Sequence, residues 1–85
     1  MILAIETSTP NAHLAILSHE GDEVVFETRF HSDRAHNSRI FDPLARALEA
    51  ANDLTRLAVG TGPGSYSGVR VGIAIANCLS VAKGI

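Results

Sequence analysis

The chain has 85 residues, which is enough for one small domain or for part of a larger one. Apolar residues make up 46% of the chain and charged residues 19%, so a hydrophobic core can form and disorder is not expected. The formal net charge of −2 has the wrong sign for a protein that binds nucleic acid on its own. A single cysteine, Cys78, excludes an intrachain disulfide and a cysteine-rich zinc site.

The N-terminal stretch predicts no targeting or membrane segment. It carries no basic leader, and its apolar run at 2–5 ends at Glu6, whereas a membrane-spanning helix needs about 20 apolar residues. We therefore expect a cytoplasmic protein that does not insert into a membrane.

Three strands are predicted in the first third of the chain, over residues 2–5, 12–17 and 23–30. The first is uniformly apolar, which is typical of a strand buried on both faces. The third alternates, with Val24, Phe26, Thr28 and Phe30 on one face. Because short polar turns separate the three strands, we expect two consecutive antiparallel hairpins.

A helix is predicted from about residue 39, with an apolar stripe formed by Phe41, Leu44, Leu48 and Ala51. Pro43 either begins this helix, with Asp42 as its N-cap, or kinks it. Residues 57–59 predict a fourth strand, and the helix before it predicts that this strand runs parallel to an earlier one.

The glycine-rich segment 60–68 is the most distinctive stretch of the chain. It lies between a strand and a helix, where backbone N–H groups can cradle a phosphate. Its spacing fits neither the Walker A loop nor the dinucleotide-binding pattern. A ligand site and a tight turn with Ser65 or Ser67 as N-cap therefore both remain possible.

The second helix is predicted over residues 67–83, ended by a left-handed cap at Gly84, and Ile85 would begin a fifth strand. It is apolar on two sides, and small residues recur every four positions at Gly68, Gly72, Ala76 and Ser80. This pattern predicts either a helix enclosed in a larger chain or a partner interface with a groove for close helix approach. His31 and His36 lie five residues apart and do not have the spacing of a helical metal pair.

Two stretches carry a family resemblance. Residues 1–9, MILAIETST, and residues 60–72, GTGPGSYSGVRVG, resemble the bacterial TsaB family, also called YeaZ, whose hallmark is G-x-G-P-G-S-[FY]-[ST]-G-[LV]-R-x-G. The stretch from His36 to Leu44 is similar to the first-helix region of that family. The resemblance implies an α/β fold of the actin-like ATPase (RNase H-like) type, with a β-β-β-α-β-α core and a mixed sheet truncated before the fifth strand. It also implies that residues 1–85 are the N-terminal domain of a longer protein.

The same resemblance implies a non-catalytic scaffold subunit for the formation of N6-threonylcarbamoyladenosine in tRNA. The expected partners are the catalytic paralogue TsaD, with which the subunit dimerises, and the ATPase TsaE. A homodimer is expected when the partner is absent, and tRNA is expected to be contacted indirectly. ATP and metal are expected to belong to the partner subunits, so no catalytic residue, metal ligand or cofactor is assigned to this chain alone.

The chain departs from working members of the fold in its first loop, where residues 6–10, ETSTP, stand in place of an aspartate followed by glycine. The histidine pair of the paralogue is also missing. Both departures favour the scaffold over two alternatives, which are an ATPase or kinase-like domain that binds nucleotide phosphates and a glycoprotease-like metallopeptidase. The candidate phosphate-loop residues are Thr7, Ser8, Gly62, Pro63, Gly64 and Ser65. The candidate partner interface consists of Ile40, Pro43, Ala47, Ala50, Val69, Gly72, Ile73, Ala76 and Ser80.

Overall fold

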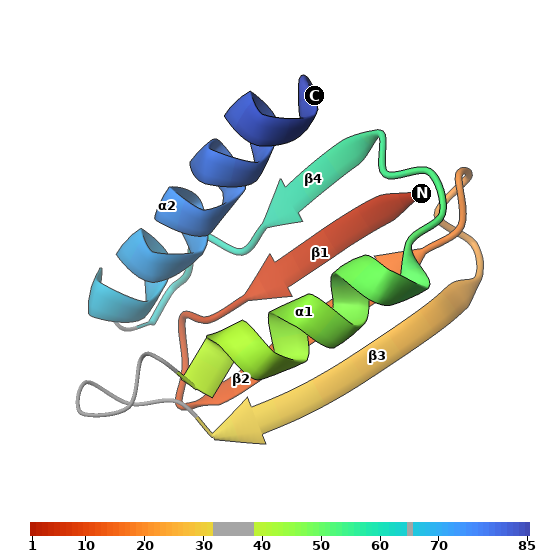
Figure 1. The fold of residues 1–85 in the computed structure, drawn as a ribbon. Coiled ribbons are helices and arrows are strands. Elements are labelled where there is room, and N and C mark those ends of the chain that lie inside the picture. Colours follow the sequence, from red (N-terminus) through yellow and green to blue (C-terminus); the bar gives the residue numbers. More distant parts are fainter. Residues whose placement is uncertain (32–38, 65) are drawn as a thin grey trace.

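The computed structural model describes residues 1–31, 39–64 and 66–85. In chain order the elements are β1 (Ile2–Glu6), β2 (Asn11–Leu17), β3 (Val24–His31), α1 (Phe41–Ala50), β4 (Arg56–Val59) and α2 (Tyr66–Lys83). Within the described residues the strands form one mixed sheet in the order β3-β2-β1-β4 (Figure 1). This is the predicted β-β-β-α-β-α order.

Strand pairing agrees with the sequence. β1 and β2 are antiparallel, as are β2 and β3, so the three strands form the two predicted hairpins. β4 pairs with β1 in parallel, which confirms the direction that the intervening helix predicted.

The strand registers place the apolar side chains on one face of the sheet. Leu3 lies opposite Ile16, and Ile5 lies opposite Leu14. All four are fully buried and form the centre of the core. Val59, the neighbour of Ile5 on β4, shares that face.

Both helices cover this same face. α1 contributes the buried Ile40 and Ala47 to the core, and α2 packs Val71 and Ile75 against it. Figure 1 shows α1 over the strands and α2 beside β4. The opposite face of the sheet therefore carries no element of the described chain.

This one-sided packing corrects the prediction that β1 is buried on both faces. Only Leu3 and Ile5 are buried in β1, because the other side chains point to the uncovered face. Val24 also departs from its predicted face and is 56% exposed. The cause is a register shift beside Ile16 and Leu17, where β3 meets β2 irregularly.

Three residues of the apolar stripe predicted for α1, Leu44, Leu48 and Ala51, pack against the core, but Phe41 does not. The inward side of α1 contains Ile40, Pro43 and Ala47, whereas Phe41 is 63% exposed. Pro43 lies in the first turn, where its missing N–H is not needed, and the N-cap is Ile40 rather than Asp42.

α2 ends as predicted. Gly84 has a φ of 70°, and its N–H donates to the Ser80 carbonyl, as does the N–H of Ile85. The helix thus ends in a left-handed cap.

Candidate functional site

The two candidate phosphate loops lie against each other in the folded chain. The turn after β1 contains Thr7 and Ser8, which are only 6% and 4% exposed. The Thr7 hydroxyl donates a hydrogen bond of 2.6 Å to the carbonyl of Gly68 in the first turn of α2. Residues that are about sixty positions apart in sequence are thereby joined at one end of the sheet.

Four glycines make room for this turn. A Cβ atom on Gly60 would overlap the carboxylate of Glu6, and one on Gly64 would overlap the Ser8 carbonyl. A Cβ atom on Gly68 would overlap the carbonyl of Thr7, and one on Gly72 would lie 2.8 Å from its Oγ1. We call Gly60, Gly64, Gly68 and Gly72 the glycine row. Their spacing of four residues provides a seat for the chain's own β1–β2 turn.

Glu6 organises that turn from the end of β1. Its Oε1 accepts a hydrogen bond of 2.8 Å from the backbone N–H of Ser8 and a second one from the Ser8 hydroxyl. These two bonds lower the pKa of the Glu6 carboxyl below its ordinary value, and the bond from the hydroxyl has the larger effect. Partial burial acts in the opposite direction. The carboxylate is therefore a cap for the turn.

In this arrangement the polar groups of the first loop bind the chain itself. The hydroxyls of Thr7 and Ser8 are buried and already donate to acceptors of the chain. The backbone of the turn lies against Gly64 and Gly68, and the side chains of Glu6 and Thr7 lie against Gly60 and Gly72. Gly62, Pro63 and Gly64 are exposed, Gly62 at a φ of 104°, and Ser65 lies outside the described residues. The contacts between the two loops favour a tight turn, and Ser67 is not its N-cap because it lies inside α2.

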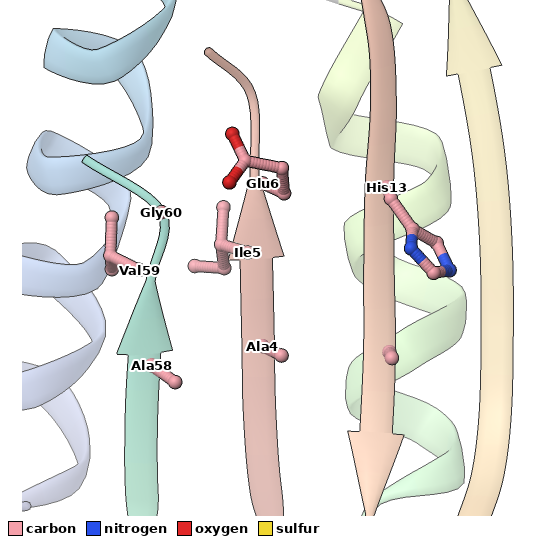
Figure 2. Close-up of a pocket in the computed structure, with 8 residues that line it drawn as sticks. Ala4, Ile5, Glu6, His13, Ala58, Val59 and Gly60 are labelled. Carbon is pink, nitrogen blue, oxygen red and sulfur yellow. The ribbon is translucent and has the colours of Figure 1, made fainter. Parts of the chain in front are cut away.

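A shallow hollow of about 330 Å³ opens on the uncovered face of the sheet. Its floor contains Ala4, Ala15 and Ala58, which neighbour one another on three strands. Figure 2 shows Glu6 at the end of β1 beside Gly60, and His13 on β2. The sequence analysis did not select His13, and only the strand register, which places it opposite Glu6, would have shown it.

His13 has a partner on the neighbouring strand. Its Nε2 lies 3.1 Å from Oε2 of Glu27, across β2 and β3. Within the described residues no group of three or more histidine, cysteine, aspartate or glutamate side chains could hold a metal ion. His36, the second histidine weighed in the sequence, lies outside these residues.

The predicted partner interface divides into buried and exposed residues. Ile40, Pro43, Ala47 and Gly72 are buried against the chain's own sheet and turn, so they offer no side chain to a partner. Ala50, Val69, Ala76 and Ser80 are partly exposed, and Ala76 packs against the core. Among the residues of the predicted interface, only Ile73, which is 39% exposed, is a large apolar side chain open to solvent.

The outward side of α2 carries apolar residues that the prediction omitted. Val81 is 86% exposed, and Ala74, Cys78 and Ala82 are also exposed. In the predicted small-residue groove, Gly68 and Gly72 contact Thr7, whereas Ala76 and Ser80 are partly exposed. In the part of the chain that the structure describes, no helix is long and apolar enough to cross a membrane.

Comparisons with known proteins agree with the resemblance seen in the sequence. The family model described as TsaD, tRNA N6-adenosine threonylcarbamoyltransferase, matches residues 25–85. The tRNA threonylcarbamoyladenosine biosynthesis protein TsaB of Escherichia coli is 37% identical over 84 residues, which are 94% of this chain and 35% of the relative. Its counterpart in Bacillus subtilis is 35% identical over 83 residues, which are 93% of this chain and 35% of that protein.

A solved structure, YeaZ from Pseudomonas aeruginosa, superposes on this chain with a TM-score of 0.76 at 30% sequence identity. The superposition covers 95% of this chain and 38% of the solved one. The mixed sheet with two helices is consistent with a truncated actin-like ATPase fold. The chain spans about a third of the length of the two curated relatives it matches.

Proposed function

The chain belongs to the TsaB/YeaZ family, and from this membership we propose that it acts in the biosynthesis of threonylcarbamoyladenosine in tRNA as a non-catalytic subunit. The relatives named for this biosynthesis support the pathway. Since the chain spans only about a third of their length, we further propose that residues 1–85 form an N-terminal domain.

The seating of the β1–β2 turn on the glycine row is the observation that carries the non-catalytic role. In an actin-like ATPase the first loop and the glycine segment would have to leave space for phosphate. In this chain the Thr7 hydroxyl binds Gly68, and Glu6 binds Ser8, so both loops are occupied by each other. We therefore place ATP and metal chemistry in the partner subunits.

The proposed partner is TsaD, the catalytic paralogue, with the ATPase TsaE as the third component. We assign the docking surface to the outward side of α2, defined by Ile73, Ala74, Cys78, Val81 and Ala82, because these residues are exposed and uncharged. Exposed apolar side chains gathered on one side of a helix, here with the polar Asn77 among them, are typical of interaction sites. A homodimer formed through the same surface is expected when TsaD is absent.

The test measures binding to purified TsaD by light scattering and the modified nucleoside content of tRNA by mass spectrometry. A complex with TsaD, and more modified nucleoside in reactions with TsaD and TsaE when this chain is added, would support the proposal. If the folded chain does not bind TsaD and adds no modified nucleoside, the scaffold role is wrong.

The ATPase or kinase-like alternative would require the β1–β2 turn to leave the glycine row. Calorimetric titration with ATP and Mg²⁺ tests it directly, because saturable binding would show that the site opens. The metallopeptidase alternative is tested by elemental analysis of the purified protein. Neither alternative is favoured by an observation in the described residues.

A further inference from the structure

We draw no further inference here: the strongest candidate, the groove of about 370 Å³ between β4 and α2 that is lined by Leu57, Val59, Ala76 and Ser80, carries none, because nothing in the described residues shows what covers it.

Discussion

Replacing Gly68 with alanine tests whether the glycine row is a seat for the β1–β2 turn. A Cβ atom at this position would lie 1.9 Å from the carbonyl oxygen of Thr7. Because the obstacle is backbone, it cannot rotate away, and overpacking of this kind typically costs about 1–3 kcal/mol. The Thr7 hydroxyl would also lose its hydrogen bond to Gly68, which contributes about 1 kcal/mol. The higher helix propensity of alanine compared with glycine offsets up to about 1 kcal/mol of this loss.

The net expectation for Gly68→Ala is a loss of about 2 kcal/mol of unfolding free energy, or a fall in Tm of roughly 8–16 °C for a chain of this size. Urea and thermal denaturation followed by circular dichroism measure it. Gly72→Ala is the matched control, since its nearest obstacle is the Thr7 hydroxyl, which Thr7→Ala removes. The loss of unfolding free energy caused by Gly72→Ala should be smaller in the Thr7→Ala background. The loss caused by Gly68→Ala should remain, because the Thr7 carbonyl is still present. If Gly68→Ala is as stable as the wild type or more so, the turn does not fill the row.

Three further outcomes are expected. Hydrogen bonds from Ser8 lower the pKa of Glu6 in the folded state, so this carboxylate stabilises the fold above its unfolded pKa. That contribution is lost as the pH falls through the folded pKa. Glu6→Gln should therefore flatten the acid limb of a curve of stability against pH, and an unchanged limb would contradict the assignment. Calorimetric titration with ATP and Mg²⁺ should give no saturable heat, and a stoichiometric isotherm would show that the turn vacates the glycine row. Ile73→Arg and Val81→Arg should abolish TsaD binding and self-association, while the free energy of unfolding stays within about 0.5 kcal/mol of the wild-type value. The control Val25→Arg, at an exposed position of the edge strand β3, should bind normally. If all three variants bind TsaD, the partner contacts another surface.

The order and direction of the elements could be predicted because local patterns determine them. The alternation in β3, the short turns and the helix before β4 each specify a strand or its direction. The residue at the start of α1 that faces the sheet could not be predicted. Phe41 and Ile40 are both apolar and adjacent, so the sequence allows either to face the sheet, and packing selects Ile40.

The alternation in β3 correctly predicted that Phe26 and Phe30 face the core, but it could not be predicted that β1 is buried on one side only. A uniformly apolar β1 is compatible with cover on both sides, and Ala4 is small enough to tolerate either environment. The residues of the site could be predicted from the sequence, but what occupies the space beside its glycines could not. Thr7, Ser8, Gly64, Gly68 and Gly72 were selected from the sequence, but a glycine pattern does not say whether a phosphate, a partner helix or the chain itself fills the space.

The packing of α2 accounts for one of the two apolar sides that its sequence shows. A helix that is apolar on two sides must bury both or present one to a partner. The side with Gly68, Gly72 and Ile75 is used within the chain, by the turn and by the core. Gly68 and Gly72 therefore allow the close approach of α2 to the turn after β1. The side with Ile73 and Val81 is not covered by the described residues, so both interpretations, cover by a longer chain and contact with a partner, stay predictions for this side. Substitutions of these exposed side chains separate binding from folding.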